Sequence, residues 1–332
     1  MLTVGLIGAG RIGRVHASTI VQDEGSQLVA VADSVDENAK NLAKLYKVNP
    51  RSVDAIFEDN SIEAILIASS TDTHSDFIEK ASIAGKAILC EKPVDLSLDR
   101  AKRCLENTKS NEHSIMMGFN RRFDPNFVAL KNALDGGEIG TAELLSITSF
   151  DPAPPPIDYV KVSGGIFKDM MIHDFDMANF LYGDLPKSVF VSASAIIDKK
   201  IGALGDYDTA VATLKYRDGR LAVIKNSRRA TYGYDQRIEV LGSKGLLQVQ
   251  NMVENSMVKS TEMGVESSKP EYFFLERYKS AYQNEWTAFV TAVKTKTPMP
   301  VSLSDGIAAL AIAEAAAASA EMGSEVEIAN FL

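Results

Sequence analysis

The amino-acid sequence predicts a two-domain α/β plus α+β protein. A doubly wound parallel sheet comes first, followed by a domain built on a large, mostly antiparallel, open-faced sheet. Apolar β runs alternate with helical patterns over residues 1–120, and a glycine-rich turn follows the first run. After residue 120 the strands become longer and alternate between polar and apolar residues. The predicted domains are a dinucleotide-binding domain at residues 1–120 and a substrate and oligomerisation domain at 121–332, whose last helix can pack back on the first domain.

The composition and charge are those of a soluble globular protein. The chain has 332 residues, enough for two domains of about 150 residues each. Its formal net charge of −9 disfavours binding to nucleic acid or to an anionic membrane. No targeting signal is expected, because residues 1–8 form an apolar strand pattern without a basic segment. We therefore expect a cytoplasmic protein with no nucleic-acid or membrane partner.

Three further residue types narrow the class of protein. The Ala-rich stretch 307–320 contains Glu314 and is too short to cross a bilayer, which predicts a packed helix. Cys90 and Cys104 lack the spacing of metal ligands, which predicts two reduced, buried thiols and no metal site. An imidazole base must come from four histidines, namely His16, His74, His113 and His173. His16 lies on the first predicted helix, where we expect it to be packed rather than catalytic.

The first half of the chain alternates strands and helices. Its strands are predicted at residues 2–8, 27–33, 63–69 and 86–92. Helical periodicity lies between them, at 11–23 and 36–47 for example. Continuous Val, Ile, Leu and Ala in a strand indicates burial on both faces, as in a parallel sheet covered by helices on each side.

The second half of the chain has a different pattern. A helix is predicted near residues 125–135, and longer strands at 142–150, 188–197, 209–216 and 220–227. Arg217-Asp-Gly-Arg220 joins the last two strands and predicts a hairpin, since Asp-Gly suits a type I′ turn. Residues 237–250 repeat the arrangement. These strands predict a mostly antiparallel sheet.

Gly8-Ala-Gly10-Arg-Ile-Gly13 follows the first strand directly and opens a helix. In a dinucleotide-binding motif the first glycine allows a tight turn, the second lets the backbone approach a pyrophosphate, and the third lets the helix pack on the strand. Asp33 ends the second strand, where the ribose-binding acid is expected. The motif and its spacing predict a Rossmann domain. The predicted contacts at the helix start are Gly8, Gly10, Arg11 and Ile12.

The charge around Asp33 indicates which dinucleotide binds. Its carboxylate can accept hydrogen bonds from a ribose 2′-hydroxyl and would repel a 2′-phosphate, and residues 34–38 contain no Arg. NAD is therefore favoured over NADP, although tolerance for NADP stays open. FAD binds in the same way, but the antiparallel second domain favours a nicotinamide cofactor.

Polar residues follow two later strands at the edge where ligands of parallel sheets bind. Ser69, Thr71 and His74 follow the third strand, and Glu91-Lys92-Pro93 follows the fourth. The first group also fits a capped loop that starts a helix. The proline restricts the backbone of Lys92, and the bond between them can be cis.

The stretch 164–181 reads as an apolar helix that carries charges. At 100° per residue, Asp169, His173 and Asp176 share one stripe, whereas Asp174 points toward the apolar side. The pattern fits a solvated acidic face as well as a functional one. With the dinucleotide motif, we expect the stripe to face a cofactor cleft.

In this order, the glycine motif, Glu91-Lys92-Pro93 and the helix with Asp169 and His173 resemble the Gfo/Idh/MocA oxidoreductases over essentially the whole chain. Within this family, residues 118–124, 151–156, 164–176 and 232–235 are most similar to bacterial inositol 2-dehydrogenases. The resemblance implies NAD-dependent oxidation of a secondary hydroxyl of a cyclitol, namely myo-inositol to 2-keto-myo-inositol (scyllo-inosose). It also implies inositol catabolism and a homotetramer packed through its open sheets.

The resemblance implies roles that the residue chemistry supports. Lys92, Asp169 and His173 are the predicted catalytic residues. Imidazole titrates near neutral pH, so His173 is a candidate base, while Lys92 can stabilise the developing negative charge on the oxygen. Whether Asp169 or His173 takes the proton is left open, because the two can titrate as a pair. Predicted cofactor contacts beyond the glycine turn are Asp33, Ser69, Thr71, His74, Glu91 and Lys92.

By resemblance, further polar residues line the polyol pocket, since a cyclitol needs paired donors and acceptors. They are Asn120, Arg121, Asp151, Tyr232 and Tyr234. Each fits a structural salt bridge, cap or core tyrosine equally well. Tyr282, in the stretch 276–289, fits a core role better than a cofactor contact.

Three alternatives to this function stay open. The protein can be a dehydrogenase of another cyclitol or of a pyranose sugar, because the same base and lysine serve any secondary alcohol. A non-enzymatic NAD-binding regulator is less favoured, since it has no need of Lys92, Asp169 and His173. The third alternative is NAD-assisted glycoside cleavage on the same scaffold.

Overall fold

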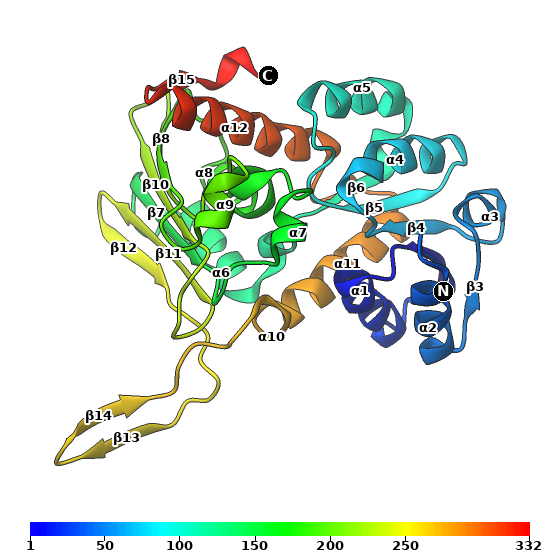
Figure 1. The fold of residues 1–332 in the computed structure, drawn as a ribbon, viewed down its shortest axis with the longest axis horizontal. Helices are drawn as coiled ribbons and strands as arrows, with labels where there is room; N and C mark the ends of the chain where they lie inside the picture. Colours follow the sequence, from blue (N-terminus) through cyan, green and yellow to red (C-terminus); the bar gives the residue numbers. More distant parts are fainter. The chain divides into compact units, whose positions relative to one another are not determined.

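The computed structural model describes residues 1–332. Contacts within the chain divide it into two compact units. The first unit comprises Met1–Phe123 and Ser280–Leu310, and the second comprises Asp124–Lys279 and Ala311–Leu332. Each unit contains one large sheet, and the elements are labelled in Figure 1.

The first unit is built on a six-stranded parallel sheet in the order β3-β2-β1-β4-β5-β6. Its strands are β1 (Leu2–Ile7), β2 (Ser26–Ala32), β3 (Asn49–Pro50), β4 (Ala64–Ile67), β5 (Ala87–Glu91) and β6 (Ile115–Gly118). Its helices are α1 (Arg11–Gln22), α2 (Asp36–Tyr46), α3 (Val53–Glu58), α4 (His74–Ile83), α5 (Leu98–Thr108) and α11 (Lys279–Thr295). The doubly wound sheet predicted from the apolar runs is confirmed. The short strands β3 and β6 were not predicted, because two to four residues carry little periodicity.

The core of the first unit explains why its strands read as continuous apolar runs. Val4 and Leu6 of β1 and Ile65 of β4 are fully buried. Each such side chain contributes about 1.5–3 kcal/mol through removal from water. Helix α11 joins this core from the far end of the sequence, because the indole N–H of Trp286 donates to Ser26 Oγ at 2.9 Å. Residues 280–310 therefore belong to the fold of the first unit.

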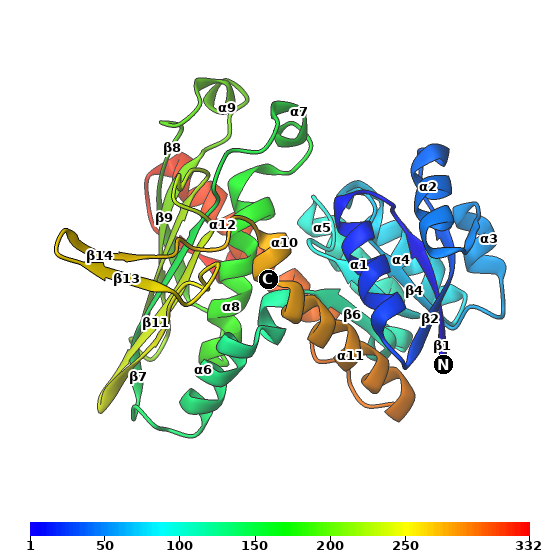
Figure 2. The same ribbon diagram turned by 90° about the horizontal axis from the view of Figure 1, so that it is seen from below.

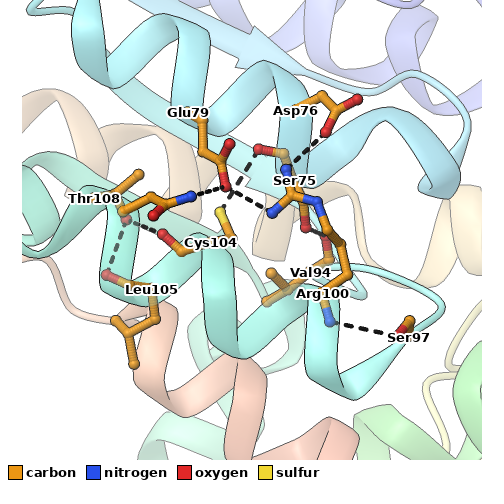
Figure 3. A network of polar contacts seen from close by, with 10 residues as sticks. Ser75, Asp76, Glu79, Val94, Ser97, Arg100, Cys104, Leu105 and Thr108 are labelled. Atoms are coloured by element: carbon orange, nitrogen blue, oxygen red, sulfur yellow. Dashed lines mark hydrogen bonds and ion pairs between the residues drawn. The ribbon is translucent and has the colours of Figure 1, made fainter.

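A polar network holds helices α4 and α5 together (Figure 3). Arg100 of α5 donates to Asp76 and to Glu79 of α4, each at 2.6 Å. Beside it, Cys104 Sγ lies 3.6 Å from the Ser75 carbonyl oxygen. Burial, and secondarily the charge of Glu79, raises the pKa of the Cys104 thiol to about 12. Both cysteines are free and buried, as predicted.

The second unit is built on a seven-stranded sheet in the order β12-β11-β7-β10-β9-β8-β15. Its strands are β7 (Ala142–Phe150), β8 (Ser188–Ser194), β9 (Thr209–Lys215), β10 (Leu221–Ser227), β11 (Asp235–Gly242), β12 (Gly245–Val249) and β15 (Val326–Glu327). Strands β7 and β10 pair in parallel and the other pairs are antiparallel, which confirms the predicted mostly antiparallel sheet. A separate hairpin, β13 (Val258–Thr261) with β14 (Gly264–Ser267), projects away from the sheet (Figure 1).

Helices cover one face of the seven-stranded sheet. The helices of this unit are α6 (Pro125–Asp135), α7 (Ile157–Val160), α8 (Ile172–Tyr182), α9 (Lys199–Ala203), α10 (Phe274–Arg277) and α12 (Leu303–Met322), which starts in the first unit. Helices α6, α8 and α12 lie to one side of the sheet (Figures 1 and 2). The other face is open and presents partly exposed apolar side chains, among them Phe190, Val211, Leu221 and Leu241.

Two details of the predicted elements were wrong. The hairpin between β9 and β10 is present, but its turn is not type I′, because only Gly219 has a positive φ, of +94°. A three-residue loop of type I followed by a left-handed glycine accounts for it. The Ala-rich helix is also longer than predicted, with 20 residues in α12. Length and composition would let it cross a membrane, but 61% of its most apolar stretch is buried in the protein, as in a core helix.

Candidate active site

The glycine turn after β1 has the geometry that a dinucleotide requires. Gly8 has a φ of +104°, and a Cβ there would lie 2.2 Å from the Ala68 carbonyl oxygen. A Cβ on Gly13 would lie 1.9 Å from the Gly8 carbonyl oxygen, so any side chain would separate α1 from the turn. A Cβ on Gly10 would meet nothing within 4 Å. The space beside Gly10 is therefore open for a pyrophosphate.

The start of α1 supplies the charge that complements this space. The helix begins at Arg11 directly after Gly10, and its first turn contains no acidic residue. The positive end of its dipole favours an anion there. These features fit the predicted contacts from Gly10, Arg11 and Ile12.

Asp33 lies just after β2 and connects it to the glycine turn. Its Oδ2 accepts from Ala9 N at 2.7 Å and its Oδ1 accepts from Val35 N at 2.8 Å. Oδ1 also accepts from Asn38 Nδ2 at 3.4 Å, so Oδ2 is the oxygen with a second lone pair to offer. The carboxylate is thus held next to the glycine turn, as expected of a residue predicted to bind a ribose.

His74 lies inside the first unit and connects the segments that follow β4 and β5. It is 1% exposed, with Nδ1 2.8 Å from the Pro93 carbonyl oxygen and Nε2 3.2 Å from that of Ser69. Burial lowers the pKa of His74, so the neutral ring is favoured and one nitrogen donates at a time. This arrangement makes His74 a support for both segments, whereas its contact with a cofactor remains a prediction. Ser69 Oγ is 2.7 Å from Thr73 Oγ1, and Thr71 starts the short turn between them.

Glu91 is the last residue of β5 and Lys92 follows it, and their side chains differ in burial. Glu91 is buried and its Oε1 lies 2.7 Å from His16 Nε2. His16 is 1% exposed, which confirms that it is packed. Lys92 is half-buried and the Lys92–Pro93 bond is cis. Tyr282 of α11 contacts the His16 ring edge-on at 5.4 Å and is buried, as a core residue is.

Asp169 and His173 lie in the second unit, where a π-helical turn (Phe167–Met171) leads into α8. The predicted stripe assumed one regular helix, and this part of the prediction was wrong. Asp176 is 1% exposed and so does not belong to an open polar face. Asp174 is fully buried, and its carboxylate accepts hydrogen bonds from Ser149 Oγ at 2.6 Å and Asn226 Nδ2 at 2.7 Å. These hydrogen bonds make the burial of the charge tolerable. These partners on β7 and β10 explain an aspartate on the apolar side.

Asp169 has two neighbours that the sequence analysis missed. Its Oδ1 accepts from Tyr159 Oη of α7 at 2.7 Å. Its Oδ2 lies 3.7 Å from Nη1 of Arg228, which is buried at the end of β10. Neither residue carries a sequence motif, and only the fold brings them to Asp169.

The predicted pocket residues are distributed over both units. Asn120 and Arg121 follow β6 in the first unit and are buried. Asp151 exchanges backbone hydrogen bonds with Ser227 and Ala230 in the second unit.

The two predicted pocket tyrosines differ sharply in exposure. Tyr232 is 48% exposed, and its hydroxyl donates to Asp235 Oδ2 at 2.6 Å. Tyr234 is 6% exposed and packs edge-on against Tyr278, with ring centroids 6.0 Å apart. Tyr232 is therefore the better placed of the two to meet a ligand.

The first unit, with its strand order, its glycine turn and the Asp33 carboxylate beside that turn, defines a Rossmann domain of an NAD-binding oxidoreductase. Residues 2–119 match the model of the oxidoreductase family with an NAD-binding Rossmann fold. Residues 127–248 match the GFO/IDH/MocA C-terminal domain. The chain therefore belongs to the Gfo/Idh/MocA family of oxidoreductases.

Relatives in this family resemble the chain over nearly its whole length. Inositol 2-dehydrogenase of Rhizobium meliloti is 48% identical, with 98% of each chain covered. Myo-inositol 2-dehydrogenase of Thermotoga maritima is 44% identical, again with 98% of each covered. A solved structure of a myo-inositol dehydrogenase from Corynebacterium glutamicum has a TM-score of 0.95 at 40% identity, covering 98% of each chain. That of scyllo-inositol dehydrogenase from Lactobacillus casei, with bound NAD(H) and scyllo-inositol, has a TM-score of 0.93 at 27% identity, covering 99% of each.

Proposed function

We propose that this protein oxidises the 2-hydroxyl of myo-inositol to give 2-keto-myo-inositol, with NAD as the cofactor. The observation that carries the proposal is similarity of 44–48% identity over nearly the full length to proteins named as inositol 2-dehydrogenases. The chain also has the three residues that the chemistry needs, Lys92, Asp169 and His173.

The reaction removes a proton from the hydroxyl oxygen and a hydride from its carbon. NAD, when bound, accepts the hydride. His173 takes the proton, because an imidazole titrates near neutral pH. Lys92 donates a hydrogen bond to the reacting oxygen and stabilises its developing negative charge. Asp169, on the preceding turn, supports the base.

The two units have separate tasks in this proposal. The part up to about residue 120 binds NAD, and the rest binds the polyol and forms subunit contacts. The cofactor is surrounded by the glycine turn and by Asp33, Ser69, Thr71, His74, Glu91 and Lys92. The cyclitol is surrounded by Asn120, Arg121, Asp151, Tyr232 and Tyr234. Of these five residues, Tyr232 is the best candidate for a contact with the cyclitol, because its side chain is the most exposed.

A substrate panel tests the proposal directly. The reduction of NAD is followed by the absorbance of NADH with myo-inositol, scyllo-inositol, D-chiro-inositol and glucose. We expect the highest kcat/KM with myo-inositol. A higher kcat/KM with another cyclitol would identify that cyclitol as the substrate. Activity with glucose alone would contradict the proposal that the substrate is an inositol. Release of the alcohol from an aryl glycoside would instead indicate glycoside cleavage.

We further propose that the protein is cytoplasmic, serves inositol catabolism and forms a homotetramer. The open face of the seven-stranded sheet supports the last point, since Phe190, Val211 and Leu241 are each about two-fifths exposed there. An exposed sheet face with apolar residues is typical of a subunit interface.

A further inference from the structure

Arg228 is a buried cation next to a predicted catalytic residue. It follows β10, is 1% exposed, and its backbone N–H donates to the Asp208 carbonyl oxygen at 2.8 Å. A guanidinium stays charged in proteins, and a buried charge requires an opposite charge close by. Arg228 has two such charges, with Nη1 3.7 Å from Asp169 Oδ2 and Nη2 3.5 Å from Asp206 Oδ2.

Asp206 connects Arg228 to the segment that carries Asp169. Its Oδ1 accepts from the backbone N–H groups of Ile166 at 2.9 Å and Tyr207 at 2.7 Å. Ile166 directly precedes the π-helical turn Phe167–Met171, on which Asp169 lies. Gly165 is tightly packed here, because a Cβ would lie 2.9 Å from Asp206 Oδ1. Asp206 therefore holds the start of the turn, and Arg228 spans from Asp206 to Asp169.

The two carboxylate oxygens of Asp169 face different groups. Arg228 faces Oδ2 and the Tyr159 hydroxyl donates to Oδ1. Lys168, the adjacent cation in the sequence, instead pairs with Glu314 of α12 at 2.8 Å. His173 lies one turn further along α8, and Asp206 lies on the far side of Arg228.

We infer that Arg228 is a positioning residue of the proposed reaction: its buried guanidinium holds the Asp169 carboxylate in one place. A permanent, buried cation at this distance attracts the carboxylate oxygen and so restricts where the carboxylate lies. Asp169 then acts as a fixed anion that supports His173, and His173 takes the substrate proton. This inference rests on the proposed function.

The test compares Arg228→Met and Arg228→Lys with matched substitutions of Arg229, its exposed neighbour. We expect kcat for myo-inositol to fall by about 100-fold in Arg228→Met and by less in Arg228→Lys, which keeps the charge but not the fork. Affinity for NADH should stay at the wild-type value, and Arg229→Met and Arg229→Lys should behave as wild type.

Two results would overturn the inference. One is a wild-type kcat in Arg228→Met. The other is a parallel loss of NADH affinity and kcat, which indicates a general structural defect. If Arg228→Met does not fold, Arg228→Lys decides by the same criteria.

A crystal structure of Arg228→Lys separates this inference from the proposed function. The Asp169 carboxylate should shift by about 1 Å or more, a displacement large enough to affect catalysis. If it stays in place, the inference fails even when the wild type oxidises myo-inositol. If the wild type oxidises no polyol, the proposed function fails, and the position of Asp169 still decides the role of Arg228.

Discussion

Lys92 is the residue whose chemistry is most directly testable. A lysine that stabilises charge on the reacting oxygen acts mainly in the transition state. Lys92→Ala should therefore lower kcat by about 100- to 1000-fold, far more than it weakens the binding of NADH. Stopped-flow measurement of NADH formation and a fluorescence titration with NADH check the two parts. Normal turnover in this variant would remove Lys92 from the mechanism.

A single buried carboxyl group, that of Glu285, makes the free energy of unfolding depend on pH. It is fully buried in α11, and neither carboxyl oxygen has a hydrogen-bond partner. Burial, and then the charge of Glu91, raises the pKa of Glu285 well above its usual 4.5. The folded protein keeps this proton at pH values where the unfolded chain releases it. Stability from this group is therefore full below pH 4.5 and is lost as pH rises toward the raised folded pKa.

Glu285→Gln removes this pH dependence, because an amide does not titrate. The free energy of unfolding of the variant should exceed that of the wild type increasingly as pH rises, by up to about 1.4 kcal/mol per unit within that window. Urea unfolding at a fixed protein concentration, near pH 6 and near pH 8, measures the difference. Equal pH slopes for the two proteins would show that Glu285 is ionised in the fold.

At the scale of elements, two glycines of the turn between β1 and α1 have different roles: Gly13 matters for stability and Gly10 for NADH binding. An added Cβ at Gly13 collides with the Gly8 carbonyl oxygen, whereas one at Gly10 meets open space. Gly13→Ala should lower the free energy of unfolding by about 1–3 kcal/mol. Gly10→Ala should leave stability unchanged but weaken NADH binding more than about 10-fold, since the methyl group occupies the pyrophosphate space. Thermal unfolding and NADH titration of both variants distinguish the two effects, and wild-type NADH affinity in Gly10→Ala would place the pyrophosphate elsewhere.

At the scale of the whole molecule, the open face of the seven-stranded sheet determines assembly in our proposal. Val211 of β9 is 41% exposed on this face. Val211→Glu should break up the tetramer at about micromolar concentration, because a carboxylate would be buried in each contact. Ile83→Glu is the matched control, since Ile83 is 88% exposed on α4 of the first unit. Light scattering gives the molar mass, and an intact tetramer in Val211→Glu would exclude this face as the contact.

The family and the glycine turn could be predicted because local sequence carries them. Gly8, Gly10 and Gly13 follow a strand and open a helix, and this order requires the turn found in the structure. The position of Asp33 directly after β2 follows from its spacing alone. The strand pattern after residue 120 likewise predicts the second sheet, since alternation of polar and apolar residues reports one buried face.

Short-range patterns in the sequence were enough to predict the two sheets and the glycine turn. Which distant polar residues pair became known from the folded domain alone. Asp174 is buried because Ser149 and Asn226 come to it, and Asp169 meets Arg228 although the two are far apart in the chain. Periodicity records which side of a helix or strand is apolar. It holds no record of the partner that makes a buried charge tolerable, because that partner arrives through the folding of the whole domain.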